Sequence, residues 1–538
     1  MALTGYIEQL HCVGLKNWFL GRQIVSHFKT TMSTMEEEDN FLRSFRNAVH
    51  HALSSKFENV RQLKPVQEEA LLQFIRRKDV FCVLPTGCGK SLIFQLVPLV
   101  CAYLHNKKFN YPEKPIPSVI CPLSALVESH IQELANYGIL SCYLGDDGLI
   151  EEEISQHSIV FTSPELIVHE ERWRKLRKSH EFQDNFFGLV TDEAHVVPKW
   201  GKGNEKSKKA AFRECFFKIG DVRSLLPQRT PVLALTATAT SEVVSDTMKG
   251  LAMKDDSYQI RVSPDRPNIF LYKQKVDKDI SKTFAWLSDL LKKEAIETPK
   301  TIVYCKSQKD CGLLFKQFKF ELGEMAYFPL GGPTVSSNML IGMFHTKTLK
   351  RHKERVSDSL FEEQGVCRVV FASTALGMGV NLQGIRQVIH YGPPREVDDF
   401  VQEIGRAGRD GQPARFLLLF HGLHLKKCEP IMKEYAKTES KCLRKLMLSK
   451  FEATSMDNDV IDLNPVFSKR HAYDILHMIR DVFEDFELNE PGDLEIQDFI
   501  SFDADLEYGG IYEESGNTGE EDSMASDSSE LSGVVELD

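Results

Sequence analysis

The stretch LPTGCGKS has the residue types of a phosphate-binding loop. Such a loop normally reads G-x-x-x-x-G-K-[S/T], whereas this one has Leu84 in place of the first glycine. Gly87 and Gly89 would let the backbone turn its amides toward phosphate oxygens. Lys90 would reach the β and γ phosphates, and the Ser91 hydroxyl would bind Mg²⁺. By itself Gly-Lys-Ser is weak evidence, because an ordinary loop between a strand and a helix explains it equally well.

Two acidic residues follow about 100 residues downstream, at the end of the apolar run in VTDEAH. Asp192 is placed to hold Mg²⁺, as the second-strand acid does in P-loop NTPases. Glu193 can orient or deprotonate the attacking water. Either acid alone could be a helix cap. Both acids together, at a strand end in a chain that also has a phosphate loop, favour nucleotide hydrolysis.

Arginines form the third candidate group, in the stretch IGRAGRDG. Arg406 and Arg409 are three residues apart, so on the helix that we expect here they would share one face. Arginines supplied from a second domain stabilise the charge on a transferring γ-phosphate. A solvated helix face or a contact to the DNA backbone are the alternatives. The neighbouring glycines permit close approach and favour the catalytic role.

The segments around these residues indicate two α/β units. Over about residues 57–262, and again over about 263–426, short apolar runs alternate with helical patterns. Continuous apolar strands separated by helices predict a parallel sheet that is covered on both faces. Ligands collect at the carboxyl ends of such strands, where TGCGKS, TSPE, DEAH and TATAT fall. The expected strands lie in DVFCVLP, PSVICPL, SIVFTSP, FGLVTDEAH and PVLALTATAT, then in TIVYCKS, CRVVFAST, RQVIHYGPP and FLLLF.

The charge of the chain is divided between a basic body and an acidic tail. The 538 residues have a net charge of −11. Residues 451–538 hold 25 acidic and three basic residues, so residues 1–450 hold 52 acidic and 63 basic ones, a net charge of +11. A basic body suits a polyanionic partner, although a modest excess is often only a solvated surface. From Glu487 onward there is no basic residue and little apolar surface to bury, which predicts disorder.

Composition excludes several classes of protein. Apolar residues make up 42% and charged residues 27% of the chain, as in ordinary globular proteins. No run of about 18 uncharged apolar residues predicts a membrane span, and the N-terminus does not read as a secretory signal. Twelve cysteines without any C-x-x-C pair indicate a reducing compartment, and most of them would be small buried hydrophobic residues.

Over about residues 57–450 the chain resembles the RecQ type of superfamily 2 helicases, especially the animal RecQ-like proteins. Helicases of this superfamily commonly lack the first glycine of the phosphate loop, which accounts for Leu84. The resemblance implies an α/β fold of two tandem RecA-like parallel-sheet domains, with a short helical C-terminal segment and an acidic disordered tail. The motifs occur together and in order: LKPVQEEAL, LPTGCGKS, CPLSALVESH, TSPE, DEAH, ALTATAT, RPNI, IVYCKS, FASTALGMGVN and QEIGRAGRDG.

This resemblance divides the chain into five parts. We expect an N-terminal extension over residues 1–55 and the ATP-binding domain over 56–262. The second RecA-like domain would cover residues 263–426. A helical remnant of the RecQ zinc module would follow over 427–486, and the acidic tail over 487–538.

The resemblance also gives roles to residues around the nucleotide. Gln67 would read the adenine edge, and Lys64 stands where the family usually has Arg, which alters any planar stacking on the base. Phe57 is a further candidate for stacking, although its spacing to Gln67 is off by about one residue. Gln402 would line the cleft beside Arg406. The whole site would comprise Lys64, Gln67, Thr86, Gly87, Cys88, Gly89, Lys90, Ser91 and Gln402, with Ser91 and Asp192 on Mg²⁺.

Further residues would couple hydrolysis to movement on nucleic acid. Thr236 and Thr238 would do so in ALTATAT, with His195 bridging to them. Gly377 opens a segment that in the family contacts both nucleotide and nucleic acid.

After DEAH the family carries an aromatic-rich loop that senses single-stranded DNA. Trp200 and the pair Phe212 and Arg213 match its two ends. Between them lie the ten residues KGNEKSKKAA, where the family usually has two. Its lysines would add phosphate contacts, or the segment is a solvated insertion.

The C-terminal part departs from the family. KCLRKLMLSKF resembles the opening of the RecQ zinc module, with Cys442 in the place of the first ligand. No cysteine follows Cys442, so a four-cysteine site cannot be completed within this chain and we expect no zinc there. An acidic tail replaces the basic winged-helix region. The tail could be autoinhibitory, bind an unknown partner, or be inert.

The resemblance therefore implies an ATP-dependent 3′-to-5′ DNA helicase. It would require ATP and Mg²⁺, act as a monomer on single-stranded and forked DNA, bind no membrane, and work in the nucleus, with the cytoplasm as the other compartment. Three alternatives stay open. They are a DNA-stimulated ATPase and translocase with little unwinding, an RNA helicase, and a nucleic-acid-binding scaffold whose ATPase has decayed.

Overall fold

The computed structural model describes residues 18–149, 151–201, 213–362, 364–377, 382–451 and 461–462, the first 18 of them as backbone alone. All of these residues belong to one compact unit, Met1–Pro465. The expected Lys-rich insertion with Phe212 and the expected acidic tail lie outside the described residues.

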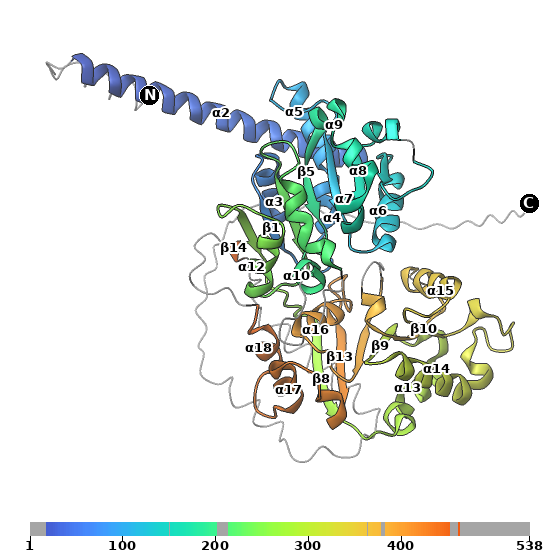
Figure 1. Cartoon of the computed structure of the whole chain (residues 1–538). Coiled ribbons are helices and arrows are strands. Elements are labelled where there is room, and N and C mark those ends of the chain that lie inside the picture. The colour runs from blue at the N-terminus through green and yellow to red at the C-terminus, as the bar shows by residue number, and fades with distance from the viewer. Residues whose placement is uncertain are drawn as a thin grey trace, which may run out of the picture. The chain divides into compact units, whose positions relative to one another are not determined.

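The first sheet has eight parallel strands in the order β14-β7-β1-β6-β5-β2-β4-β3 (Figure 1). Apolar residues point alternately to its two faces. In β1, Val80 and Cys82 belong to one core cluster, whereas Phe81 and Val83 belong to another. The sheet is therefore covered on both faces, as the continuous apolar runs predict. The strands are β1 Val80–Val83, β2 Ile116–Ile120, β3 Ser141–Tyr143, β4 Ile159–Thr162, β5 Phe186–Thr191, β6 Val232–Thr236, β7 Tyr258–Arg261 and β14 Ile461–Asp462.

Helices follow nearly every strand of this sheet and supply the covering layers. They are α3 Pro65–Ile75, α4 Lys90–Gln95, α5 Val97–Asn106, α6 Ser124–Asn136, α7 Pro164–His169, α8 Glu171–Leu176, α9 His180–Asn185, α10 Val196–Gly201, α11 Ile219–Arg223 and α12 Ser241–Gly250, with 3-10 turns η1 Glu151–Gln156 and η3 Glu214–Lys218.

A long helix, α2 (Trp18–Lys56), precedes this domain, and its N-terminal end projects away from it (Figure 1). Its C-terminal part is core, because buried apolar residues recur there at helical spacing: Phe45, Ala48, Val49, Ala52 and Leu53. Part of the stretch that we expected as an extension thus packs on the ATP-binding domain.

The second sheet has six parallel strands in the order β10-β11-β9-β12-β13-β8, again with a core cluster on each face. Its strands are β8 Ile269–Lys275, β9 Thr301–Cys305, β10 Ile341–Phe344, β11 Val369–Ala372, β12 Gln387–Tyr391 and β13 Ala414–Phe420. Its helices are α13 Ile280–Glu294, α14 Gln308–Leu322, α15 Lys350–Phe361 and α16 Val397–Ile404, with 3-10 turns η4 Ala295–Glu297, η5 Gly323–Ala326, η6 Ser336–Asn338, η7 Thr374–Gly377 and η8 Gly422–Leu425.

Two short helices follow the second sheet, α17 (Pro430–Lys437) and α18 (Leu443–Leu448). Buried Met432, Tyr435 and Met447 attach them to the core cluster of that sheet. They occupy the start of the expected helical remnant, and most of the rest of that remnant lies outside the described residues.

The predicted fold class, two tandem parallel-sheet α/β domains, is confirmed. Every strand that we expected is present. The sequence patterns missed the edge or near-edge strands β3, β7, β8, β10 and β14. Of these, β3, β7 and β14 are short and lack a continuous apolar run, whereas β8 and β10 contain short apolar runs that were not recognised as strands.

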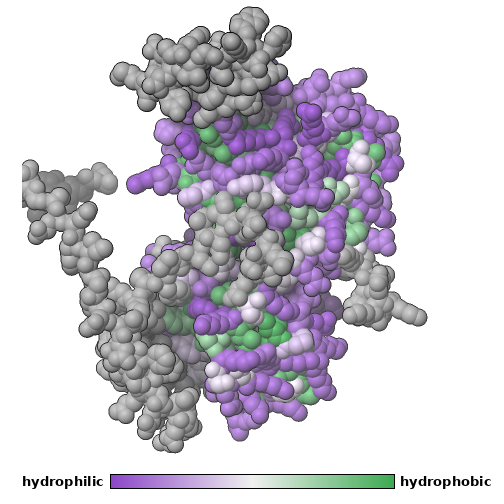
Figure 2. All heavy atoms as spheres, turned by 90° about the vertical axis from the view of Figure 1, so that its left-hand side faces the viewer, coloured by the Kyte–Doolittle hydropathy of each residue, from purple (hydrophilic) through white to green (hydrophobic). Residues whose placement is uncertain are grey.

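On the face in Figure 2, hydrophilic side chains predominate in the described part, with apolar residues scattered among them. Among the described helices, none is both long and apolar enough to cross a bilayer.

Candidate active site

The phosphate loop joins β1 to α4, at the carboxyl end of a central strand of the first sheet. Gly87 and Gly89 have φ of +79° and +75°, a conformation in which a side chain is strained. A Cβ on Gly89 would also lie 2.6 Å from the side-chain nitrogen Nε2 of Gln67. Lys90 opens α4, and its Nζ donates to the carbonyl of Leu84 at 3.3 Å. The loop therefore has the local geometry that its glycines predict.

Gln67 links the phosphate loop to the entrance of α3. Its Nε2 donates to the carbonyls of Cys88 and Gly89, both at 2.9 Å, and its Oε1 accepts from the Lys64 amide at 2.8 Å. The Lys64 ammonium lies 3.4 Å from the carbonyl of Gly87. Both residues are thus beside the loop, and their contact with adenine stays a prediction.

Phe57 does not fit the stacking role that we considered for it. Its side chain is 1% exposed and its ring centroid lies 4.4 Å from that of Tyr137 in the core. A ring enclosed in this way cannot lie against a base, so this expectation is wrong. The imperfect spacing between Phe57 and Gln67 was the signal against it.

The two acids follow β5, which is separated from β1 by one strand, so they leave the sheet at the same edge as the phosphate loop. Asp192 Oδ1 accepts from the Glu193 amide at 3.0 Å, and Asp192 Oδ2 lies 3.2 Å from His130 Nε2 on α6. Although burial disfavours the charged imidazole, its contacts with Asp192 and Glu133 raise the pKa of His130 to about 9. No sequence pattern indicated a role for His130.

Glu193 has a backbone conformation that is unusual for a side-chain-bearing residue, with φ of +49°. Such strain persists where the surrounding structure enforces it, often at functional sites. Burial opposes ionisation of Glu193, yet contact with His195 and the nearby charges of Lys90 and Arg406 lower its pKa. The carboxylate is therefore ionised, and cations from both domains surround it.

His195 joins the acids to the threonines after β6. Its Nδ1 lies 2.9 Å from Thr236 Oγ1 and 3.3 Å from Glu193 Oε2. The Thr236 hydroxyl donates its own proton to the carbonyl of Thr238 at 3.0 Å, so His195 Nδ1 must be the donor to Thr236. The predicted catalytic acid thus contacts His195, and His195 is hydrogen-bonded to the segment ALTATAT.

The two arginines lie in turns, which corrects our expectation of a helix. α16 ends at Ile404, and residues 405–410 form turns. Gly408 and Gly411 have φ of +55° and +80°, a conformation that does not occur within a helix, so no helix runs through Arg409. Burial, and then the adjacent charge of Arg406, lower the pKa of Arg409 to about 10.

The turns that carry Arg406 and Arg409, residues 405–410 and called the arginine turns below, contact the phosphate loop directly. The hydroxyl of Thr86 donates to the carbonyl of Gly405 at 2.7 Å. A Cβ on Gly87 would lie 3.7 Å from the carbonyl oxygen of Arg409. Gln402 is buried on α16, just before these turns. Residues 319 positions apart in the chain are thus brought to one place, as the motifs predict.

Arg266 and Asn268, in the linker motif RPNI, donate hydrogen bonds to main-chain carbonyls of the arginine turns. Arg266 donates to the carbonyls of Thr86 at 3.3 Å, Gly405 at 3.4 Å, Ala407 at 3.3 Å and Gly408 at 2.5 Å. Asn268 Nδ2 donates to the carbonyls of Gly408 and Gln412, both at 2.8 Å. The motif marked this segment as part of the resemblance, but nothing in its residue types indicated these partners.

Lys199 makes a second contact between the domains. Its Nζ on α10 lies 2.7 Å from Glu396 Oε2 and 2.6 Å from Asp399 Oδ1 on α16. Burial would lower the pKa of Lys199, but the two carboxylates raise it overall. No sequence pattern distinguished this lysine from an ordinary surface residue.

Two of the residues predicted to sense DNA are together. The Trp200 ring packs edge-on against Phe216, with centroids 5.5 Å apart, and the Arg213 guanidinium lies 5.6 Å from the centre of the Trp200 ring. Arg213 also pairs with Glu165 through two hydrogen bonds. Its charge is therefore already partnered. Phe212 lies outside the described residues, and Gly377 ends the turn η7.

Family models identify the class of protein. The DEAD/DEAH box helicase model matches residues 64–247, and the helicase conserved C-terminal domain model matches residues 282–411. The chain therefore carries the paired domains of a DEAD/DEAH box helicase.

Curated relatives refine this class. The chain is 29% identical over 458 residues to the mouse "Bifunctional 3'-5' exonuclease/ATP-dependent helicase WRN", covering 80% of this chain and 29% of the relative. It is 30% identical over 371 residues to the Bacillus subtilis "Probable ATP-dependent DNA helicase RecS", covering 68% and 65%. It is 27% identical over 374 residues to mouse "ATP-dependent DNA helicase Q1", covering 67% and 51%. The resemblance to RecQ-type helicases is therefore confirmed, and the chain spans less than two thirds of the length of each of these relatives.

Solved structures support the fold. Yeast Dbp5 bound to RNA and ADP BeF3 matches with a TM-score of 0.54 at 15% identity, over 80% of this chain and 96% of that one. The DUF1998 helicase MrfA bound to DNA matches with a TM-score of 0.52 at 16% identity, over 70% and 51%. At such identities the likeness concerns the fold alone.

Proposed function

We propose that this protein is an ATP-dependent DNA helicase, which couples hydrolysis of Mg-ATP to 3′-to-5′ movement on single-stranded DNA and to duplex unwinding. One observation carries the hydrolytic part of this proposal. Glu193 is an ionised, strained carboxylate that lies among Lys90 and His195 of the first domain and Arg406 of the second. This arrangement suits a base or orienting group for water whose surroundings stabilise developing phosphate charge.

Each residue of the site has a proposed task in hydrolysis. Lys90 binds the β and γ phosphates, and the amides of the loop hold the phosphate oxygens. Glu193 orients the attacking water and accepts its proton. Arg406 and Arg409 stabilise the charge on the γ-phosphate in the transition state, because the turns that carry them contact the loop from the second domain.

The residues present fit a magnesium ion. Ser91 offers a hydroxyl and Asp192 a carboxylate, and Mg²⁺ prefers oxygen ligands of this kind together with water and phosphate. When bound, the ion would neutralise charge between the β and γ phosphates. Hydrolysis should therefore require a divalent cation, and chelation should abolish it.

Contacts between the domains support the coupling of hydrolysis to movement. Thr86 with Gly405, and Lys199 with Asp399, join the phosphate loop and α10 to the arginine turns and α16. Because these contacts surround the nucleotide site, a change from ATP to ADP can weaken one set and allow the domains to separate. Alternating closure of two domains is an established way to move along a strand.

DNA is the proposed nucleic acid. The relatives named above include ATP-dependent DNA helicases, and the basic excess of residues 1–450 suits a phosphate backbone. RNA stays the alternative, because the solved structures of similar fold include RNA complexes. The nuclear compartment and the monomeric state rest on the resemblance alone.

The test compares the wild-type protein with Lys90→Ala in ATP hydrolysis, with and without single-stranded DNA. We expect DNA to stimulate the wild type and the variant to lose at least about a hundredfold in turnover, the scale of a lost transition-state contact. Among the described residues the Lys90 ammonium makes one hydrogen bond, to the Leu84 carbonyl, so thermal unfolding should change little. Equal turnover in the two proteins would overturn the enzymatic assignment.

Strand displacement decides the second half of the proposal. The substrates are duplexes with a 3′ or a 5′ single-stranded tail, and the RNA version of each is the matched control. We expect release of the strand from the 3′-tailed DNA only. Release from the 5′-tailed substrate would reverse the polarity, and preference for RNA would change the substrate class.

A translocase with little unwinding is the second candidate. The observation that favours it is the C-terminal part, where α18 follows a single exposed thiol, Cys442, and the chain holds no later cysteine for a zinc module. In this case DNA would stimulate ATP turnover without release of any strand from either tailed duplex.

A further inference from the structure

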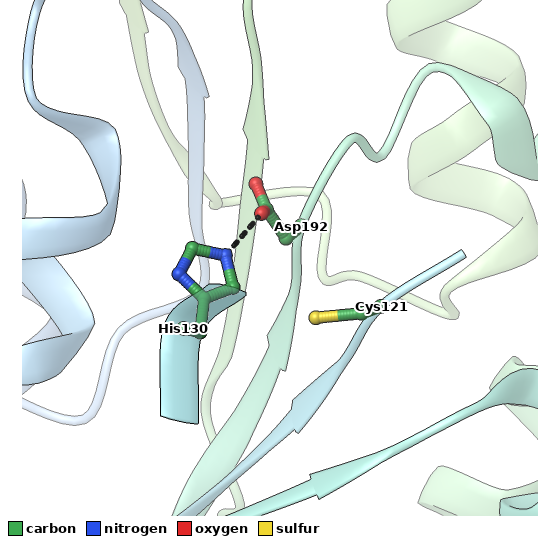
Figure 3. A group of neighbouring side chains, drawn as sticks. All are labelled: Cys121, His130 and Asp192. Atoms are coloured by element: carbon green, nitrogen blue, oxygen red, sulfur yellow. Dashed lines mark hydrogen bonds and ion pairs between the residues drawn. The ribbon is translucent and has the colours of Figure 1, made fainter. Parts of the chain in front are cut away.

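Three potential metal ligands meet in the first domain, next to the candidate active site. Cys121 follows β2, His130 lies on α6 and Asp192 follows β5, which is the neighbour of β2 in the sheet. Figure 3 shows the imidazole turned toward the Asp192 carboxylate and the Cys121 thiol pointing toward the space beside the imidazole. One ligand atom from each residue lies within 4.8 Å of the other two, and all three side chains are buried.

The surroundings fix the imidazole in this orientation. Its ring stacks on Phe161, with centroids 5.6 Å apart, and meets Phe94 edge-on at 5.5 Å. Glu133 Oε2 lies 3.9 Å from the outer nitrogen, Nδ1, so Nε2 is the nitrogen that faces the cluster, 3.2 Å from Asp192 Oδ2. A metal would therefore find one ring nitrogen already aimed and its rotation restricted.

The chemical types of these three ligands favour zinc over magnesium. A thiolate, an imidazole and a carboxylate are the ligands of zinc, with bond lengths of about 2.0–2.3 Å and a fourth position open to water. Ligand atoms around such an ion are about 3.3–3.8 Å apart, so only a small closure of the present cluster is required. Mg²⁺ binds oxygen and has little use for a thiolate or an imidazole. Within the described residues this is the one group that meets the geometric requirement.

We propose that Cys121, His130 and Asp192 form an inhibitory site for Zn²⁺ or another thiophilic divalent cation. The inhibitory consequence rests on the proposed function, because Asp192 is there the carboxylate that holds Mg²⁺. A zinc ion bound between Cys121 and His130 takes this carboxylate, and the nucleotide site loses its magnesium ligand. This site is distinct from the four-cysteine module that Cys442 would have opened.

Binding involves no redox step. Zn²⁺ from solution displaces one proton from the Cys121 thiol and one from the His130 imidazole, and forms bonds to sulfur, nitrogen and a carboxylate oxygen. Both protons go to solvent. Chelation of the ion returns the protons and restores Asp192, so inhibition is reversible.

The first experiment measures metal binding without nucleotide or activity. Cobalt replaces zinc as a spectroscopic probe, and the full chain is titrated with Co²⁺ to detect a thiolate-to-cobalt charge-transfer band in the near ultraviolet. We expect the band in the wild type and in Cys142→Ser, which removes another buried thiol. It should be absent from Cys121→Ser and from Cys121→Ala. A wild type without the band, or a Cys121 variant that keeps it, overturns the proposal.

The second experiment measures inhibition. Each protein is compared with itself at saturating Mg-ATP, with and without micromolar Zn²⁺ buffered by a chelator. We expect at least a tenfold loss of turnover in the wild type and in Cys142→Ser, and little loss in Cys121→Ser. Cys88→Ser tests whether zinc inhibits by binding elsewhere, because Cys88 is a partly exposed thiol in the phosphate loop and could bind zinc instead of Cys121. Resistance of Cys88→Ser, with Cys121→Ser still inhibited, would overturn the proposal.

The two readouts separate this proposal from the proposed function. A cobalt band that depends on Cys121 in a protein without ATP turnover supports the site and contradicts the enzyme. Turnover that is indifferent to zinc, in a protein that shows no band, supports the enzyme and contradicts the site. Thermal unfolding of each variant without metal verifies that a lost band is not a lost fold.

Discussion

Thr236 and Thr238 look equivalent in the sequence, but their hydroxyl groups differ in the hydrogen bonds that they make. Thr236 accepts from His195 and donates to Thr238, whereas the Thr238 hydroxyl is buried without a hydrogen-bond partner in the described structure. The motif ALTATAT suggests similar roles for the two. The structure gives them different costs of substitution.

We predict that Thr236→Val destabilises the protein and that Thr238→Val does not. Valine has a similar shape, so the first change chiefly removes the hydrogen bonds of the Thr236 hydroxyl to His195 and to the Thr238 carbonyl, at a cost of about 1–3 kcal/mol. The second change removes a hydroxyl that makes no bond. Thermal unfolding of both variants beside the wild type measures the difference, and equal melting temperatures would contradict the assignment of the His195 proton.

A buried pair in the second domain should make stability depend on pH. His390 Nε2 lies 3.2 Å from Glu403 Oε2, and the side chains are 0% and 6% exposed. Burial lowers the pKa of His390 to about 3 and raises the pKa of Glu403 well above its ordinary value. Near neutral pH the folded pair therefore keeps one proton, on Glu403.

The unfolded pair holds no proton above about pH 6.5 and two below about pH 4.3. Because the folded pair holds one, stability should fall as pH rises above about 6.5 and fall again below about 4.3, by up to about 1.4 kcal/mol per pH unit. Glu403→Gln should abolish the loss on the alkaline side. Melting temperatures between pH 5 and 9 test this, and an unchanged alkaline slope in the variant would contradict it.

Among the elements, α18 is short but is tied to the linker between the domains. Arg444 pairs with Asp265 and donates to the carbonyls of Arg266 at 3.0 Å and Ile269 at 2.6 Å. These carbonyls flank the side chains that hold the arginine turns. The helical remnant therefore supports the linker, whether or not it ever belonged to a zinc module.

We predict that Arg444→Ala destabilises the protein by about 2–3 kcal/mol, because it leaves partly buried Asp265 and two carbonyls without their donor. Lys450→Ala is the matched control, since the Lys450–Glu429 pair, 3.0 Å long, is more exposed and should be worth less than about 1 kcal/mol. Denaturant unfolding compares the two. Similar losses would mean that Arg444 is only another surface charge.

The sequence predicts central elements better than edges. Continuous apolar runs identify β1, β5 and β6 because both faces of these strands are buried. β8 begins with the short apolar run Ile269–Tyr272 but leaves most of its residues partly exposed and ends in polar residues, so it was not recognised as a strand. We expected a helix at Arg406 and Arg409 because residues three apart share one face of a helix. The helix α16 instead ends at Ile404, and positive φ at Gly408 and Gly411 keeps the following residues in turns.

The same limit applies to the site. The phosphate loop and the two acids are predictable, because their chemistry requires particular residue types at fixed spacing. His130, Lys199 and Arg266 were missed because each acts on groups distant in sequence, and Arg266 binds only carbonyls, which every residue has. Only the tertiary structure brings such partners together.

For the whole molecule, the division of charge predicts self-competition for DNA. We expect deletion of residues 487–538 to tighten binding to single-stranded DNA at low salt by at least about threefold, and to have little effect at high salt, where charge interactions are screened. Fluorescence anisotropy over a salt series measures this. A control tail of equal length, with Asp and Glu replaced by Asn and Gln, should behave as the deletion does. Unchanged affinity at low salt would dispose of autoinhibition.

The linker grip on the arginine turns has a consequence for how this protein can evolve. Arg266 and Asn268 hold the turns by main-chain oxygens, so a lineage can exchange the side chain of Gln412 without loosening the grip. Gly408 has no such latitude, because a Cβ there would lie 2.4 Å from the Asn268 amide. Nor can lysine replace Arg266, since one ammonium cannot span four carbonyls as a planar fork does. Descendants should therefore vary at Gln412 long before Arg266 or Gly408 changes.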